Sequence, residues 1–473
     1  MKEKLFFYIR SVVAIICIIS SCCLYGSDVK SDISLNVDIS EKEESKEREP
    51  IVQSPETDNT ENVEDVGHPQ TLSIVSSVRE MVNTDEYYIL SATNTIWSYD
   101  FVEKKWKNTN IFAPSVLCGD IFDGNIIFTL TTPAVKAFEL TADYDTDYSY
   151  TYVQDYLEAD GYRKDLPVPI VLSWKNDINA VNTEISINNI DGTKEQIYYT
   201  VENSIAIYNL VPDRTYYYEI TALYENGVRI LLEERCFFTK SDRTRMLKID
   251  GIQNARDIGG YIGIDGKKVR YELIYRGSAM DDVSINNLYI SEEGKTELLE
   301  KIGIGTDIDL RGANNYTQSA LGSNVEFYTL PYSYQSYELA ITNKTQKEYF
   351  KNLLEFMVTQ LSEYEDANGK THHKKPIYIH CQGGCDRTGT LVFLLLGLLG
   401  VNESDLAKEY ELSSFSNIGY YRTRNSPYYG YYGMVEAIKS YGKDKFSDNF
   451  EAFAEDCGIS KETIEIFRNI MLG

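Results

Sequence analysis

The feature that most constrains this 473-residue sequence is a tract in which an apolar strand turns through glycines into an apolar helix. The strand is expected at residues 376–380 and the helix at 390–396, and the sequence Cys-Gln-Gly-Gly-Cys-Asp-Arg-Thr-Gly separates them at 381–389. A strand, a glycine turn and a helix N-terminus direct successive N–H groups toward one point, with about half a positive charge from the helix. The tract therefore predicts a cradle for an anion the size of phosphate.

Two side chains in this tract carry the expected chemistry. Cys381 stands at the mouth of the cradle, where the N–H groups and the guanidinium of Arg387 should lower the thiol pKa, and the thiolate is the nucleophilic form. The planar fork of Arg387 can bind two oxygens of a tetrahedral dianion. The predicted phosphate-binding residues are Gln382, Gly383, Gly384, Cys385, Asp386, Arg387 and Thr388.

With His380 before it, paired glycines within it and Thr388 after it, the tract resembles the phosphate-binding loop of the protein tyrosine phosphatase superfamily. Two other interpretations fit the cysteine and arginine less well. Rhodanese-type sulfurtransferases usually have a shorter active loop, and a buried cysteine with a helix-capping arginine would be purely structural.

Four further motifs narrow the resemblance to bacterial tyrosine and lipid phosphatases whose loop reads His-Cys-x-x-Gly-Lys-Asp-Arg. They lie, in order, at 254–261, 274–277, 307–311 and 410–413, so the resemblance covers roughly residues 245 to 473. It implies hydrolysis of phosphotyrosine, sometimes of phosphoserine or phosphothreonine, and sometimes of phosphoinositides.

The same resemblance implies roles for individual residues. Cys381 would form a phosphocysteine that water hydrolyses, Arg387 would stabilise the transferred group, and no metal or cofactor would be needed. Asp386 is expected to be the general acid, with Asp309 as the alternative; either carboxylate could instead pair with a nearby arginine. The supporting residues are expected to be His380, Arg276 and Arg311.

One loop position departs from the family pattern. Cys385 replaces the family's lysine, which removes a cation that would favour highly charged lipid headgroups. A second thiol four residues from Cys381 also allows a protective, reversible disulfide, although a small side chain facing away from substrate is the simpler interpretation.

Composition excludes several other functions. The formal net charge of −26 repels nucleic-acid phosphates, so no nucleic-acid partner is expected. Eight cysteines are too few for a disulfide scaffold of this length, and four histidines leave little material for a metal site.

The N-terminus has the layout of an export signal at residues 1–21, with basic residues before the apolar run at 12–19. Ile19-Ser20-Ser21-Cys22 resembles a bacterial lipobox, which implies lipidation of Cys22 and a membrane-anchored, extracytoplasmic lipoprotein. Residues 22–70 are acidic and proline-containing, which is typical of a disordered tether.

The remainder is expected to be multidomain. Residues 71–140 are predicted to be a β-rich region of open role, and 141–240 a β-sandwich with Trp174 in its core. The placement of Leu210, Pro212 and Tyr216 resembles the tyrosine corner of fibronectin type III domains. Residues 241–473 alternate strands and helices, as in an α/β domain, with further helices expected at 403–411 and 461–471, among others.

The leading hypothesis is a surface-tethered cysteine phosphatase, most consistent with phosphotyrosine substrates. An inositol phosphate or phosphoinositide phosphatase is the first alternative. A non-catalytic surface protein, with the sandwich binding a surface partner, is the second.

Overall fold

A computed structural model describes the side chains of residues 128–141, 153–157, 166–175, 179–190, 196–240, 243–282, 288–312, 317–332, 337–365, 371–416, 418, 421–424 and 430–473. It describes the backbone alone for strand residues 77–78, 81–83, 86–90, 95–100, 105–112, 127 and 195. The expected signal peptide, Cys22 and the tether lie outside the described residues. Within the described ranges no helix is long and apolar enough to cross a membrane.

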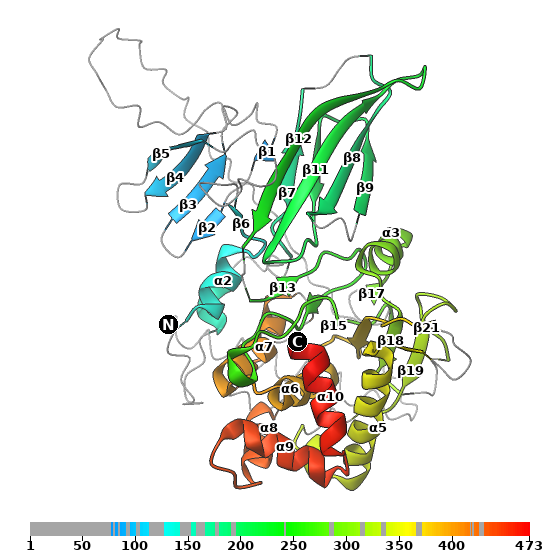
Figure 1. Ribbon diagram of the computed structural model, residues 1–473. Helices are drawn as coiled ribbons and strands as arrows, with labels where there is room; N and C mark the ends of the chain where they lie inside the picture. Colours follow the sequence, from blue (N-terminus) through cyan, green and yellow to red (C-terminus); the bar gives the residue numbers. More distant parts are fainter. Residues whose placement is uncertain are drawn as a thin grey trace, which may run out of the picture. The chain divides into compact units, whose positions relative to one another are not determined.

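The C-terminal region is built on a six-stranded mixed sheet (Figure 1). Its strand order is β13 (Arg245–Met246), β14 (Arg256–Asp257), β15 (Ile274–Gly277), β22 (Ile377–His380), β18 (Thr306–Asp309) and β19 (Glu326–Thr329). The last four strands are parallel, and β13 and β14 form an antiparallel edge. The α/β architecture expected for residues 241–473 is confirmed.

Strand β22 is central, and its alternating side chains separate two apolar cores. Ile377 and Ile379 face the larger core, which includes side chains of α5 (Lys344–Leu361) and α6 (Arg387–Leu398). Tyr378 faces the other core, with Leu298 from the π-helix Glu297–Ile302 that continues α3 (Glu292–Thr296). Burial on both faces explains why the first three residues of the strand, Ile377, Tyr378 and Ile379, are all apolar or aromatic.

Four more helices complete the larger core: α7 (Glu403–Glu411), α8 (Tyr431–Lys439), α9 (Phe446–Asp456) and α10 (Lys461–Leu472). The sequence predicted α7 and α10, whereas α8 and α9 were missed. Helix α6 begins at Arg387, three residues before the expected start, because the loop itself forms its first turn.

One helix of this core comes from the segment expected to be β-rich. In α2 (Pro133–Glu139), Val135 and Phe138 are fully buried in the larger core, and the Phe138 ring lies 5.7 Å from that of Phe415. The Lys408 ammonium donates to the carbonyl of Glu139 at 2.9 Å. Residues 133–139 are therefore helical and pack with the α/β region, although they lie in the segment predicted to be β-rich.

Two other sheets enclose a separate apolar core. One has the order β1 (Ser77–Val78), β7 (Ile170–Ser173), β10 (Ser204–Ile207); the other β6 (Ile127–Phe128), β12 (Arg229–Thr239), β11 (Arg214–Leu223), β8 (Asn182–Asn189), β9 (Glu195–Thr200). Trp174 and Tyr216 are buried in this core, as expected. The Tyr216 hydroxyl accepts a 2.9 Å hydrogen bond from the Val211 N–H.

A further antiparallel sheet lies nearer the N-terminus. It contains β2 (Met81–Asn83), β3 (Glu86–Leu90), β4 (Thr95–Asp100) and β5 (Lys105–Phe112) in sequential order.

Candidate active site

The glycine loop lies at the carboxyl end of β22, where the topology of a parallel sheet places ligand sites. His380 is paired with Gly277 of β15 on one side and Asp309 of β18 on the other, and the loop runs from Cys381 directly into α6. Gly384 has a φ of +71°, and a Cβ there would lie 2.2 Å from the Gly277 carbonyl oxygen. The second glycine of the pair is thus required by both its backbone conformation and its close contact with β15.

Cys381 lies at the base of this loop with 2% of its surface exposed. Burial opposes ionisation of the thiol, and the charge of Asp386 opposes it further. The guanidinium of Arg387 and the hydroxyl and N–H of Thr388 outweigh both, so the pKa of Cys381 lies below its ordinary value. The structure thus brings Cys381, Arg387 and Thr388 together in the manner expected of a nucleophilic thiolate.

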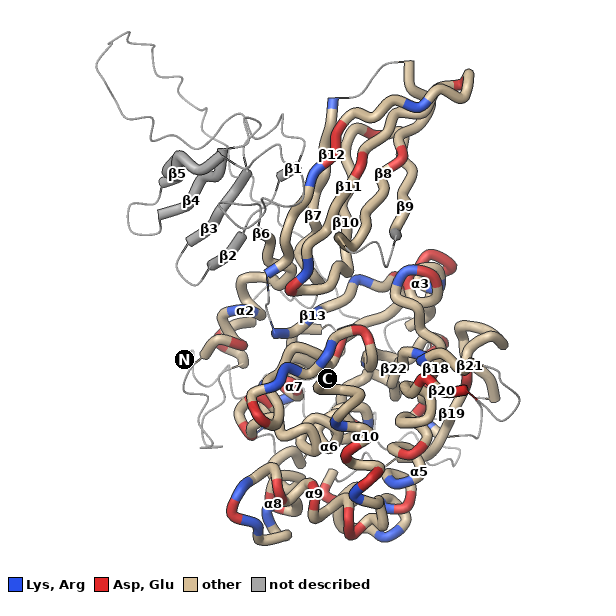
Figure 2. Tube along the Cα trace, viewed as in Figure 1, with Lys and Arg blue, Asp and Glu red and all other residues tan. Residues whose placement is uncertain are grey.

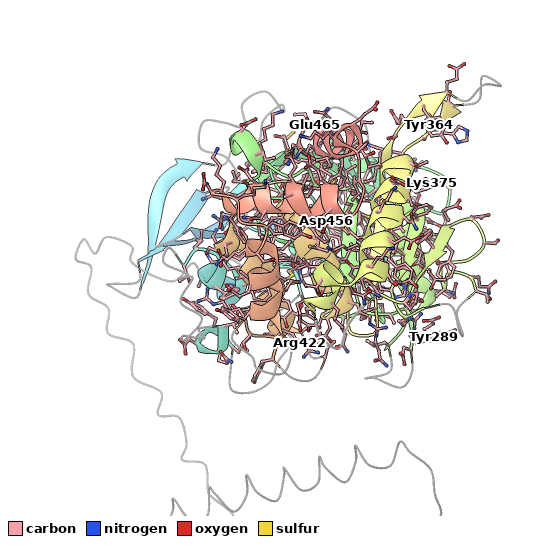
Figure 3. All side chains as sticks on the ribbon, turned by 90° about the horizontal axis from the view of Figure 1, so that it is seen from below. Tyr289, Tyr364, Lys375, Arg422, Asp456 and Glu465 are labelled. Carbon is pink, nitrogen blue, oxygen red and sulfur yellow. The ribbon has the colours of Figure 1, made fainter. Side chains whose placement is uncertain are left out.

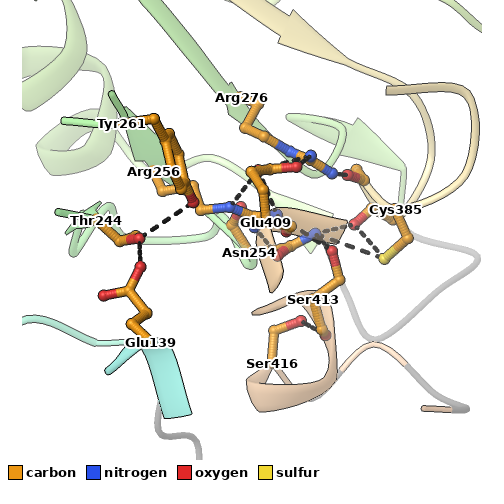
Figure 4. A network of polar contacts seen from close by, with 12 residues as sticks. Glu139, Thr244, Asn254, Arg256, Tyr261, Arg276, Cys385, Glu409, Ser413 and Ser416 are labelled. Atoms are coloured by element: carbon orange, nitrogen blue, oxygen red, sulfur yellow. Dashed lines mark hydrogen bonds and ion pairs between the residues drawn. The ribbon is translucent and has the colours of Figure 1, made fainter. Parts of the chain in front are cut away.

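The side chain of Cys385 lies beside Asn254 in a polar network with Arg256, Arg276 and Glu409 (Figure 4). Its thiol donates to the Gly383 carbonyl at 3.3 Å and accepts from the Asn254 side-chain amide at 3.5 Å. Burial raises its pKa to about 12. Any contact of Cys385 with a phosphate would therefore come from its backbone. The disulfide considered between Cys381 and Cys385 is not formed in this structure, where both are free thiols.

Two buried arginines brace the loop from behind. Arg276 donates to both Glu409 carboxylate oxygens, at 2.9 and 2.7 Å, and to the carbonyl of Gly384 in the loop. Arg256 donates from Nε to Glu409 at 2.9 Å and also contacts Asn254. Figure 4 shows this network joining β14, β15 and α7 to the loop.

Arg276 lies in one of the motifs recognised in the sequence, whereas its partner Glu409 does not. Glu409 lies one residue before the motif at 410–413, inside a predicted helix, where a single glutamate carries no distinguishing signal.

His380 is held under the loop by carboxylates of the neighbouring strand. Its Nε2 lies 3.0 Å from an Asp307 oxygen, and its Nδ1 lies 3.2 Å from the carbonyl oxygen of Cys381 and 3.9 Å from Asp309. Burial favours the neutral ring, but Asp307 and Asp309 outweigh it and raise the pKa of His380 to about 9. His380 thus contacts the loop backbone at Cys381.

This arrangement predicts a pH dependence of stability. Because the pKa rises from about 6.5 in the unfolded chain to about 9 in the folded one, the contribution of His380 is complete below about pH 6.5 and disappears as pH rises through 9. The His380→Gln variant should lack this dependence, with a difference of up to about 3 kcal/mol in unfolding free energy at low pH. Urea unfolding at pH 6 and 9.5, followed by far-UV circular dichroism, measures the unfolding free energy of the wild-type protein and of His380→Gln. An equal pH dependence of the unfolding free energy in the two proteins would contradict the prediction.

Asp309, the alternative candidate for the general acid, lies at the end of β18 beside His380. It is fully buried and accepts from Arg311 Nε at 2.9 Å and from Nη2 at 2.8 Å. Burial acts against its charge, yet His380 and Arg311 hold the pKa of Asp309 below its ordinary value. Arg311 also pairs with Asp281 at 2.7 Å, so its guanidinium joins two carboxylates, those of Asp281 and Asp309.

Asp386 occupies the residue before α6, with 27% of its side chain exposed. Its carboxylate accepts from Arg422 Nε at 2.7 Å and Nη2 at 3.0 Å, and from the hydroxyl of Tyr337. Each of the two candidate aspartates is thus paired with an arginine, Asp309 with Arg311 and Asp386 with Arg422. Neither Tyr337 nor Arg422 lies in a recognisable motif.

The predicted Gln382 points to a short hairpin formed by β16 (Asp281–Asp282) and β17 (Leu288–Tyr289). Its amide donates to Asp282 at 3.0 Å. Among the residues whose side chains are described, no cluster of three or more His, Cys, Asp or Glu could hold a metal ion.

The C-terminal part of this chain is similar to known proteins. Residues 247–473 match the family model described as "Tyrosine phosphatase family". A Cupriavidus necator protein named "Putative tyrosine-protein phosphatase" is 27% identical over 190 residues, which cover 37% of this chain and 66% of the relative. The core catalytic domain of the PP-IP phosphatase SIW14 from S. cerevisiae aligns at 17% identity and a TM-score of 0.21, over 40% of this chain and 83% of that chain.

The family match spans nearly all of the α/β region and contains every residue described above around the loop. It supports a phosphatase of the cysteine type.

Proposed function

We propose that this protein is a cysteine-dependent phosphomonoesterase acting on protein phosphotyrosine. The observation that carries the proposal is Cys381, a buried thiol of lowered pKa in a loop closed by Arg387 and Thr388. A structural cysteine in an apolar core would have a raised pKa, as Cys457 has at about 12.

The proposed reaction has two steps. The Cys381 thiolate attacks phosphorus and forms the S–P bond while the bond from phosphorus to the ester oxygen breaks; a proton from Asp386 neutralises the departing oxygen. Water then attacks the phosphocysteine, its proton returns to Asp386, and the thiolate leaves with a hydrogen bond from Thr388. Arg387 and the loop N–H groups stabilise the transferring oxygens in both steps.

The charges around the loop favour a substrate with one phosphoryl group. Four arginines near the loop form ion pairs with carboxylates: Arg256 and Arg276 with Glu409, Arg311 with Asp281 and Asp309, and Arg422 with Asp386. Lys and Arg also alternate with Asp and Glu over the surrounding helices (Figure 2). These compensated charges offer little extra attraction to an inositol polyphosphate, which needs several cations.

Phosphate release from a substrate panel tests the proposal. The full chain, in reductant and EDTA, should hydrolyse phosphotyrosine peptides with a kcat/KM at least about tenfold above that for phosphoserine peptides, inositol phosphates or phosphoinositides. Cys381→Ser provides the blank. A higher kcat/KM for an inositol compound would favour the inositol phosphate or phosphoinositide alternative. Absence of phosphate release from every substrate would refute the proposed phosphatase activity.

For the rest of the chain we propose a lipoprotein anchored through Cys22 outside the cytoplasm, with a fibronectin type III-like sandwich as spacer. The order β12-β11-β8-β9 opposite β1-β7-β10 and the Tyr216 hydroxyl bond support the sandwich assignment. Radiolabelled palmitate incorporation that is lost in Cys22→Ala tests the anchor.

A further inference from the structure

Asp386 is the N-cap residue of α6, yet its side chain does not cap the helix. Aspartate at this position normally accepts a hydrogen bond from the first turn. Here both carboxylate oxygens turn instead to Arg422, one of them also accepting from Tyr337. The orientation of this carboxylate is therefore set by two residues far away in the sequence.

Both partners are themselves fixed. Arg422 is 8% exposed, and its N–H and carbonyl are bonded to the Ser414 hydroxyl at 2.9 and 2.8 Å. Tyr337 is 1% exposed, and its hydroxyl lies 3.4 Å from that of Tyr410 in α7. Figure 3 labels Arg422 on the segment that follows the 3-10 helix Leu412–Phe415.

A preset carboxyl group is what proton transfer to a leaving oxygen requires, because misplacement of a catalytic group costs rate even when the group is present. Resting on the proposed function, we infer that Arg422 and Tyr337 are positioning residues that hold Asp386 where it protonates the leaving oxygen. In that step the O–H bond of protonated Asp386 breaks, the proton joins the ester oxygen as it takes the P–O electron pair, and the carboxylate left behind is paired with Arg422.

The role of a general acid is revealed by the leaving group. A phenolate that is stable as an anion departs without a proton, whereas a basic one needs the acid. Arg422→Gln should therefore lower kcat/KM about 30-fold or more for phenyl phosphate, but less than about threefold for 2,4-dinitrophenyl phosphate. Asp386→Asn should also lower kcat/KM mainly for phenyl phosphate, and by a larger factor than Arg422→Gln. Tyr337→Phe should lower the same kcat/KM by a smaller factor.

The double variant Asp386→Asn/Arg422→Gln provides the strictest test, because a residue that acts only through Asp386 adds no loss once Asp386 cannot donate. Arg468→Gln is the matched control. Arg468 also pairs with carboxylates, Glu451 at 3.0 Å and Glu465 at 3.1 Å, and should leave the leaving-group dependence unchanged. Vanadate binding and thermal unfolding show whether the loop and fold survive in each variant.

The outcomes separate this inference from the proposed function. If Arg422→Gln lowers kcat/KM equally for the two aryl phosphates and also weakens vanadate binding, Arg422 contacts the phosphoryl group. The inference is then wrong. If Asp386→Asn itself shows no leaving-group dependence, the inference fails while the phosphatase stands. A wild-type protein inactive on both esters would instead overturn the proposed function.

Discussion

Replacing Cys381 with serine is expected to lower phosphate release by about 10⁴-fold or more while the fold is kept. The serine hydroxyl has nearly the size of the thiol but does not ionise near neutral pH, so the loop N–H groups and Arg387 have no anionic nucleophile to stabilise. Steady-state release from a phosphotyrosine peptide measures the loss. Retained vanadate binding would show that the phosphate cradle is intact.

The matched control is Cys457→Ser. Cys457 is also a buried free thiol, but burial raises its pKa to about 12, and it lies at the end of α9. Its replacement should leave turnover unchanged. At neutral pH, iodoacetate should alkylate Cys381 well before Cys385 or Cys457, and substantial turnover by Cys381→Ser would refute the phosphocysteine mechanism.

Sequence was informative about the loop because the chemistry there is local. Nucleophile, glycines, arginine and helix start all lie within nine residues, so one pattern predicts both the backbone path and the anion cradle. The partners of the loop were missed for the opposite reason. Tyr337 and Arg422 lie 49 and 36 residues from Asp386, and no local pattern marks a side chain that acts only after folding.

The same limit applied to the fold. Strand β22 was found because three consecutive buried residues, Ile377 to Ile379, are apolar or aromatic. In contrast, α2 was hidden by its β-rich surroundings despite Thr132 and Pro133, which are typical of a helix start. Its packing on Phe415 shows that the α/β core draws on chain from before the sandwich. A fragment beginning at residue 241 would lack this helix and expose part of that core.

Glu409→Gln is expected to lower the unfolding free energy by about 3–5 kcal/mol, the largest stability change among the predicted variants. Glu409 faces two guanidinium groups, those of Arg256 and Arg276, which are 1% and 0% exposed. The substitution keeps the shape but removes the negative charge, so two buried cations repel each other without compensation. Burial already lowers the pKa of Arg276, with Arg256 acting in the same direction.

Urea unfolding of the full chain followed by far-UV circular dichroism suits this test, because the described helices pack in the α/β region. Tryptophan emission does not suit this test, because Trp97, Trp106 and Trp174 all lie before the α/β region in the sequence. The matched control is Glu451→Gln, which removes a carboxylate 35% exposed beside Arg468 and should cost less than about 1 kcal/mol. Because Arg276 also holds the Gly384 carbonyl, folded Glu409→Gln protein should bind vanadate more weakly. Equal stability of the two variants would mean that Glu409 is not the counter-ion on which the rear of the loop depends.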